Sequence, residues 1–278
     1  MIENPREGRQ PLKIETIKGP NDSEVSYCPE RGGIITSIKL QGREILYLDQ
    51  ITFQDPKVSV KGGIPILFPN AGPIKGPEFP SLEKHGFARN LRWRGERGQS
   101  VFMETLNADD NTKKIFPFNF MLSIGGRFNK DGSVSLNQSV QNLEQEQTLP
   151  VSMGLRPYFC VSHESKKDIK FSFEGGDLIE QGVETWSNGG VISIENPKLH
   201  DSKAVLRVVI PFLGTLIIDV SKEYKRIWVW SLPGKDFVCI EPVMRDSGGL
   251  VNDPEHINPG MVLNAEINIR LKDKAKKK

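Results

Sequence analysis

Cysteine is scarce in this chain of 278 residues, and long apolar runs are missing. Cys28, Cys160 and Cys239 form a sparse, odd set without CxxC spacing, which argues against a disulfide framework or a zinc site. No run approaches the ~20 apolar residues of a membrane span, and Met1–Glu7 lacks the apolar stretch of a signal peptide. We therefore expect a cytoplasmic protein without a membrane partner.

An excess of charge of one sign is also missing, since 37 Lys and Arg residues stand against 35 Asp and Glu residues, for a formal net charge of +2. The dense basic run at 272–278 has no face of combined aromatic and basic residues beside it. A solvated, frayed tail is therefore favoured over a nucleic-acid-binding arm. We expect no nucleic-acid partner.

Long windows with a 3.6-residue apolar period are absent too, which indicates few and short helices. Short stretches rich in Val, Ile and aromatic residues occur instead, separated by Gly, Pro, Asn and Asp. They predict strands at 33–40, 121–128, 133–140, 170–173, 191–195, 204–210, 215–220 and 226–230, with a hairpin turn at 129–132. At ~11 residues for a strand and its loop, the chain would hold roughly 25 strands. The pattern predicts an all-β fold, a large antiparallel sandwich.

No composition shift or long linker marks a domain boundary, so residues 1–278 are predicted to form one domain. Residues 1–20 and 272–278 are expected to be peripheral or frayed. Two segments, 61–93 and 241–259, interrupt the strand pattern, and long irregular segments in compact domains often carry function. The first contains five prolines, which predict a rigid loop suited to the wall of a binding site.

Two features of the first segment invite a functional interpretation. Gly62-Gly63 could cradle a phosphate, but no Lys-Ser/Thr follows and no βαβ unit surrounds it, so a structural use is favoured. A lone histidine such as His85 is usually structural or solvated. Arg89 and Trp93 lie close to it in sequence and favour a sugar site, which needs polar groups beside an apolar platform.

These residues belong to motifs that together resemble the glucose-6-phosphate 1-epimerase-like branch of the galactose mutarotase-like superfamily, which includes the aldose 1-epimerases. The motifs are Lys61–Pro65 (KGGIP), Phe68-Pro69, His85–Arg89 (HGFAR) with Trp93, Gly154–Phe159 (GLRPYF), Val238–Pro242 (VCIEP) and Asn258–Gly260 (NPG). The resemblance covers roughly residues 25–271. It implies a β-supersandwich fold and an enzyme that interconverts the α and β anomers of a hexose or hexose 6-phosphate.

Ring opening needs a base for the O1 proton and an acid for the ring oxygen O5. Glu241 follows an apolar strand and precedes a proline, so we expect it to emerge at a strand end; it could also be an ordinary exposed glutamate. By the resemblance, Glu241 is the base and His85 polarises the sugar near O5. The second histidine of the family, its usual acid, is replaced by Arg156.

An arginine is a poor proton donor at neutral pH, because its pKa exceeds ~12. Three outcomes stay open. His85 could act as the acid, Arg156 could leave only slow catalysis, or the chain could bind a sugar without turnover. The alternative to an epimerase is therefore a non-catalytic protein of the same fold that binds or senses a sugar or sugar phosphate. A structural module without a ligand is the least favoured hypothesis.

The resemblance also predicts binding residues. Lys61 and Arg89 occupy the basic positions that hold the phosphate in the phosphosugar branch, although a lysine lacks the two-pronged guanidinium. Lys84 and Arg92 add positive charge, or form a solvated face. Arg156, Tyr158 and Asn70 complete the predicted substrate-binding set, although Asn70 is followed by Ala71 where some relatives have arginine.

The remaining histidines, His163, His200 and His256, have no persuasive context, and a surface position is favoured for His163. The four histidines lack metal-ligand spacing such as HExxH, so we predict no metal and no cofactor. The expected partner is a small-molecule sugar or sugar phosphate, and the expected state is a monomer or weak dimer.

Overall fold

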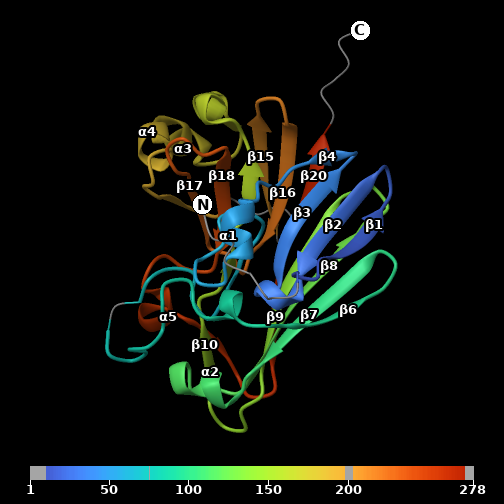
Figure 1. The fold of residues 1–278 in the computed structure, drawn as a ribbon. Helices are drawn as coiled ribbons and strands as arrows, with labels where there is room; N and C mark the ends of the chain where they lie inside the picture. The colour runs from blue at the N-terminus through green and yellow to red at the C-terminus, as the bar shows by residue number, and fades with distance from the viewer. Residues whose placement is uncertain (1–10, 75, 198–202, 273–278) are drawn as a thin grey trace, which may run out of the picture.

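The computed structural model describes residues 11–74, 76–197 and 203–272, and strands dominate it (Figure 1). The strands are β1 Glu15–Gly19, β2 Ser23–Cys28, β3 Ile34–Leu40, β4 Arg43–Glu44, β5 Ile66–Leu67, β6 Arg94–Arg97, β7 Val101–Asn107, β8 Phe120–Phe128, β9 Val134–Asn142, β10 Leu149–Val151, β11 Gly154–Leu155, β12 Tyr158–Cys160, β13 Lys170–Phe171, β14 Ile192–Glu195, β15 Lys203–Ile210, β16 Gly214–Ser221, β17 Arg226–Trp230, β18 Phe237–Val243, β19 Glu255–Ile257 and β20 Val262–Lys272.

The helices are short, as the missing 3.6-residue period predicts. They are α1 Gln50–Gln54, α2 Asp110–Ile115, α3 Gly176–Gln181, α4 Val183–Trp186 and α5 Gly249–Asn252, with 3-10 helices η1 Pro29–Arg31, η2 Ala88–Asn90 and η3 His163–Asp168. In the described part of the chain, no helix is long and apolar enough to cross a membrane.

Two large sheets form the layers of the fold. One has the strand order β13-β15-β16-β20-β9-β8-β7-β6, and the other has the order β14-β17-β18-β11-β5, with β12 also paired to β18. A third sheet, β1-β2-β3-β4, and the small β10-β19 ladder complete the set. The ladders between these strands are antiparallel, which confirms the predicted large antiparallel sandwich.

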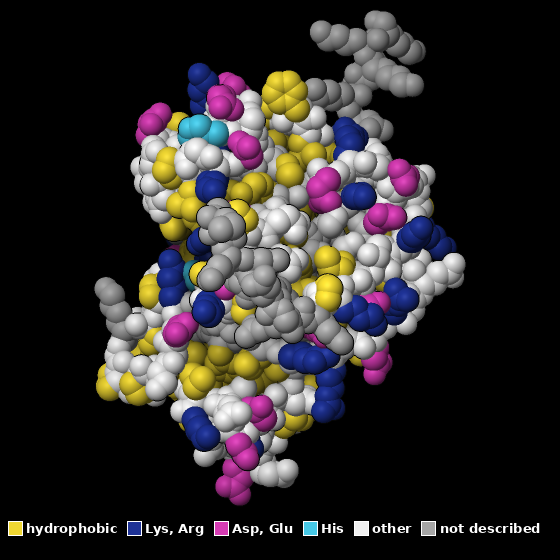
Figure 2. Space-filling model, in the orientation of Figure 1, with side chains coloured by type: hydrophobic (Ala, Val, Ile, Leu, Met, Phe, Trp, Pro, Cys, Tyr) yellow, Lys and Arg dark blue, Asp and Glu magenta, His cyan; other side chains and the backbone are white. Residues whose placement is uncertain are grey.

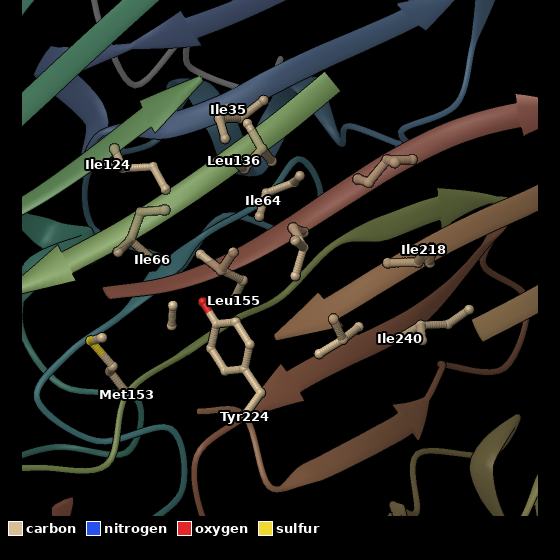
Figure 3. Close-up of a cluster of buried hydrophobic side chains, with 14 of the residues drawn as sticks. Ile35, Ile64, Ile66, Ile124, Leu136, Met153, Leu155, Ile218, Tyr224 and Ile240 are labelled. Carbon is tan, nitrogen blue, oxygen red and sulfur yellow. The ribbon is translucent and has the colours of Figure 1, made fainter. Parts of the chain in front are cut away.

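The main core lies between the layers. Figure 3 shows Ile124, Leu136 and Ile218 of the eight-stranded sheet near Ile66, Leu155 and Ile240 of the β18 sheet. Ile35 and Ile64 add side chains from the N-terminal part of the chain. Because successive side chains on a strand point to opposite faces, this core uses only one face of each sheet.

The other face of the β18 sheet does not pack into the main core, so its side chains can form a binding site. Val238 and Ile240 of β18 belong to the main core, whereas Phe237 and Cys239 belong to a separate cluster with Trp230. The alternation places the odd-numbered side chains of β18, Glu241 among them, on the face turned away from the main core.

Most strand predictions are confirmed, and the hairpin turn at 129–132 joins β8 to β9 as expected. Within residues 1–20, which were expected to be peripheral or frayed, residues 15–19 form the edge strand β1, whose Ile17 is buried. Two other expectations need correction. The described residues contain 20 named strands rather than roughly 25, because several loops are longer than the assumed spacing. The segment 241–259 is only partly irregular, because it includes the end of β18, helix α5 and strand β19.

Residues 1–10, most of the predicted frayed tail (273–278) and His200 lie outside the described residues. On the face drawn in Figure 2, Lys and Arg side chains are interspersed with Asp and Glu over the N-terminal strands rather than gathered in one band.

Candidate active site

A cleft of about 700 Å³ opens on the face of the β18 sheet that is turned away from the main core. It is lined by residues from the two loop segments, from neighbouring turns and from four strands of this sheet, β12, β14, β17 and β18. The lining residues are Ser59, Val60, Lys61, Pro73, Lys84, His85, Arg89, Arg156, Tyr158, Gly189, Val191, Ser193, Trp228, Trp230, Glu241, Asp246 and Ser247. Six of the seven predicted site residues are therefore in one cavity.

Glu241 lies at the floor of the cleft, inside β18. The strand continues to Val243, so the expectation that Glu241 emerges at a strand end is wrong. Its carboxylate is 0% exposed, which also excludes the ordinary exposed glutamate. Burial raises the pKa of Glu241, and the Arg156 guanidinium acts against that shift. A buried carboxylate of this kind is a functional-site candidate, because it is held where water cannot solvate it.

Arg156 stands opposite Glu241 in the sheet. Gly154 pairs with Val243 and Tyr158 pairs with Cys239, so the residue midway between them faces Glu241. The Arg156 Nε atom is 2.9 Å from Glu241 Oε2. The glutamate raises the pKa of Arg156 against the cost of burial, so the guanidinium is charged.

His85 reaches the cleft from a strained loop. Its φ of 73° is in the left-handed region, which is uncommon for a residue with a side chain. Gly86, which follows, also has positive φ, and a Cβ there would lie 1.9 Å from the carbonyl oxygen of Phe68. The glycine lets this loop approach Phe68 and so fixes where His85 points.

Both ring nitrogens of His85 are engaged. Nδ1 contacts the carbonyl oxygen of Ala71, and Nε2 is 2.7 Å from Arg156 Nη2. Burial, with the positive charge of Arg156 as the next cause, lowers the pKa of His85 to about 2. The ring is therefore neutral at physiological pH.

Trp230 holds the second carboxylate oxygen of Glu241, a role that the sequence analysis missed. Its indole Nε1 donates a hydrogen bond to Glu241 Oε1, and the Arg156 Cζ atom lies 5.3 Å from its ring centroid. Trp228 of the same strand faces Glu241 directly across the β17–β18 ladder. Tryptophans two positions apart on one strand share a face, and that spacing was the available sequence signal.

Asp246 closes one side of the cleft and was also not predicted. It accepts hydrogen bonds from the Trp228 indole at 2.8 Å and the Ser193 hydroxyl at 2.6 Å, and its ion pair with Arg226 measures 2.9 Å. Because these contacts occupy the Asp246 carboxylate, it forms part of the cleft wall and is not free to act as a second base.

Three further cations surround the opening. Lys61, Lys84 and Arg89 line the cleft, and none has an ion-pair partner within the described ranges of the chain. Lys61 Nζ is 6.0 Å from the Trp230 ring centroid, and Arg89 Nη2 donates to the Lys84 carbonyl at 3.1 Å. Burial and the charge of Arg156 lower the pKa of all three side chains. An anionic group would relieve this accumulation of positive charge.

Asn70 and Tyr158 differ in their positions. Tyr158 lines the cleft and packs edge-on against Trp230, with ring centroids 5.9 Å apart. Asn70 does not line it, because its side-chain amide donates to the carbonyls of Gly72 and Glu83 at 2.6 and 3.1 Å. Asn70 therefore ties two parts of the 61–93 loop together, and this geometry does not support the predicted sugar contact.

Gly62 and Gly63 have the structural use that the sequence favoured. Cβ atoms there would lie 2.5 Å from Leu48 Cα and 2.4 Å from the Ile35 carbonyl oxygen. Buried Arg31, another residue that sequence analysis missed, donates to carbonyls of Thr52, Phe53, Asp55 and Val58 and so holds the chain that leads to the cleft.

The other described histidines do not line the cleft. His163 is exposed in η3, and its Nδ1 accepts from the Gly234 amide at 3.2 Å, whereas His256 is exposed in β19. Within residues 11–74, 76–197 and 203–272, no group of three or more His, Cys, Asp or Glu side chains could hold a metal ion.

Comparison with known proteins agrees with this architecture. The chain is 28% identical over 151 residues to a candidate glucose-6-phosphate 1-epimerase from Cenchrus ciliaris, which covers 50% of this chain and 44% of that protein. It is 29% identical over 146 residues to a similarly described protein from Escherichia coli, which covers 50% of this chain and 46% of that protein. The chain thus spans about half the length of these curated relatives.

Solved structures match over nearly the whole chain. The Slr1438 protein from Synechocystis superposes with a TM-score of 0.82 at 26% identity, covering 95% of this chain and 97% of that one. A galactose mutarotase related enzyme from Lactobacillus acidophilus shares the fold, with a TM-score of 0.72 at 19% identity, covering 95% and 99%. The aldose 1-epimerase family matches residues 15–272, and the chain belongs to that family.

Proposed function

We propose that this protein is an aldose 1-epimerase that interconverts the α and β anomers of a hexose or hexose 6-phosphate in the cleft above β18. One observation carries the proposal: a fully buried carboxylate, Glu241, lies beside a charged donor, Arg156, on the floor of a cavity large enough for a sugar. Family membership agrees with this chemistry.

Glu241 has the properties that the base requires. It removes the proton from the O1 hydroxyl as the C1–O5 bond breaks, and it returns a proton to O1 after the ring closes on the other face of the aldehyde. Burial raises its pKa and so increases its basicity, while Arg156 and Trp230 keep the carboxylate oriented. A positioned acid–base group of this kind accelerates a reaction typically by about 10²–10⁴-fold.

The cationic side chains favour a phosphorylated substrate. Lys61, Lys84, Arg89 and Arg156 outnumber the acidic lining residues Glu241 and Asp246. Arg156 is paired with Glu241, so the other three cations remain for a ligand anion. The proteins described as candidate glucose-6-phosphate 1-epimerases among the relatives agree with this assignment.

A non-catalytic sugar or sugar-phosphate binding protein is the second candidate. The observation in its favour is that both oxygens of Glu241 are already engaged, one by Arg156 and one by Trp230. A base held in this way would need to exchange one of these contacts for the sugar hydroxyl.

Anomer exchange measured by NMR on glucose, galactose and glucose 6-phosphate separates the two. Glu241→Gln is the matched variant, because it keeps the size of the side chain but cannot take a proton. An epimerase accelerates exchange over buffer, and Glu241→Gln loses about 10²-fold or more of that acceleration. Saturable binding without acceleration by the wild type would instead identify the binding protein.

A further inference from the structure

His85 has no proton to give to a sugar. A carbonyl oxygen only accepts hydrogen bonds, so the contact with Ala71 places the hydrogen of the neutral ring on Nδ1. Nε2 then carries a lone pair and accepts from Arg156 Nη2 at 2.7 Å. The protonated ring, which could donate from Nε2, is disfavoured by burial and by the neighbouring guanidinium.

The positions of Arg156 and Glu241 match the two oxygens that react. In a hemiacetal ring, O1 and O5 are attached to the same carbon, so the groups that serve them must also be neighbours. The Arg156 Nε and Glu241 Oε2 atoms are 2.9 Å apart, and both residues line the cleft. A substrate carbon placed above this pair would present O1 to Glu241 and O5 to Arg156.

We propose that Arg156 replaces a proton-donating acid with a permanently charged hydrogen-bond donor for O5, and that Glu241 is the titrating group of the ring-opening step. His85 and Trp230 are positioning residues, since each holds one member of this pair. The inference rests on the proposed epimerase function and assigns the group that assists O5.

Ring opening needs no reactant other than the sugar and water. Glu241 takes the proton from O1, the C1=O1 double bond forms, and the electron pair of the C1–O5 bond moves to O5, where Arg156 stabilises the negative charge. A water molecule then protonates O5. Closure reverses these events after rotation about the C1–C2 bond, with O5 deprotonated by hydroxide and O1 protonated by Glu241.

Lysines are the competing proton donors. The charged and titratable groups that face Arg156 are Glu241 of β18, Tyr158 of β12, Cys239 of β18, and His85, Lys61, Lys84 and Arg89 of the 61–93 loop. Among them, Lys61 and Lys84 have lowered pKa values, so either could supply a proton and would then give the rate an alkaline decline. Tests of the inference therefore need variants of both.

The deciding experiment is the pH dependence of anomer exchange by NMR, from about pH 5 to pH 9, with glucose as substrate. We expect the rate to rise through one acidic ionisation and then to stay level. His85→Gln keeps a donor toward Ala71 and an acceptor toward Arg156, and should lower the rate by less than about tenfold with the same profile. Arg156→Met should lower it by about 10²–10³-fold.

Arg156→Lys guards against misfolding of the Met variant, because it keeps the charge and should retain more activity than Met. An alkaline decline in the wild type that disappears in His85→Gln, Lys61→Met or Lys84→Met would overturn the inference and leave the epimerase proposal standing. A wild type that accelerates no sugar would remove the epimerase proposal itself.

Discussion

Arg156, in the link between β11 and β12, faces Glu241 of β18 with 2.9 Å between Nε and Oε2, and both residues are buried. Two opposite charges in such a position depend on each other, because removing one leaves the other buried without compensation. The Arg156–Glu241 pair is therefore expected to affect both the stability of the fold and the proposed ring-opening chemistry.

Arg156→Met is expected to lower the free energy of unfolding by about 3–5 kcal/mol, since it leaves the Glu241 carboxylate buried without its cation. Urea unfolding followed by tryptophan fluorescence measures this change. In the Arg156→Met/Glu241→Gln double variant the loss should be smaller than the sum of the two single losses. Additive losses would mean that the pair contributes no coupling energy.

A second buried carboxyl, Glu104 on β7, predicts a pH-dependent stability unrelated to the cleft. It is 0% exposed, and neither carboxyl oxygen has a hydrogen-bond partner in the described part of the structure. Burial raises its pKa to about 8 from 4.5. Between these values the folded protein binds a proton that the unfolded chain does not, so the free energy of unfolding falls as pH rises, by up to about 1.4 kcal/mol per pH unit.

Glu104→Gln should abolish this component, and it should be more stable than the wild type at pH 9 while matching it near pH 4. Thermal or urea unfolding at several pH values measures the effect. Glu96→Gln, at an exposed position of the neighbouring strand β6, is the control for the loss of a carboxylate as such. Parallel curves for Glu104→Gln and the wild type would contradict the burial argument.

Gly86→Ala tests how the 61–93 loop places His85. The backbone conformation alone costs about 1–2 kcal/mol for a residue with a Cβ, and the added atom would also lie 1.9 Å from the Phe68 carbonyl oxygen. We expect a larger loss of stability than that, together with slower anomer exchange. Gly234→Ala is the matched control, because Gly234 has nearly the same φ, 66°, and nothing within 4 Å of its Cβ position. Equal losses in both variants would show that the close approach to Phe68 is unimportant.

The sequence predicts much of this site because its motifs are local. Apolar alternation and turn residues identify the strands, and the HGFAR, GLRPYF and VCIEP segments contain His85, Arg156 and Glu241. The interior position of Glu241 was not predictable in the same way. Proline usually ends a central strand, but here Pro242 lies within β18, opposite Ile227 of β17.

The sequence did not predict the side-chain contacts between segments that are far apart in the chain. The hydrogen bond from Trp230 to Glu241 and the bond from Arg156 to His85 join residues that only the folded sheet brings together. For Asn70 the sequence predicted a contact that the structure does not support. Its motif position suggested a contact with the ligand, but its side-chain amide donates hydrogen bonds to carbonyls of its own loop. Residue type at a motif position thus predicted location in the fold better than it predicted hydrogen-bond partners.

The phosphate assignment predicts a substrate-dependent effect. Lys61→Met and Arg89→Met should each raise the KM for glucose 6-phosphate roughly tenfold, because each removes a charged hydrogen-bond donor, and should change the KM for glucose much less. Lys61→Arg should lower the KM for the phosphosugar, since a guanidinium can hold a phosphate through two hydrogen bonds. Lys57→Met, at an exposed position outside the cleft lining, is the control for a general loss of positive charge. Equal changes in KM for both sugars in the cleft variants would place the phosphate elsewhere and leave these cations as general contacts to the sugar ring.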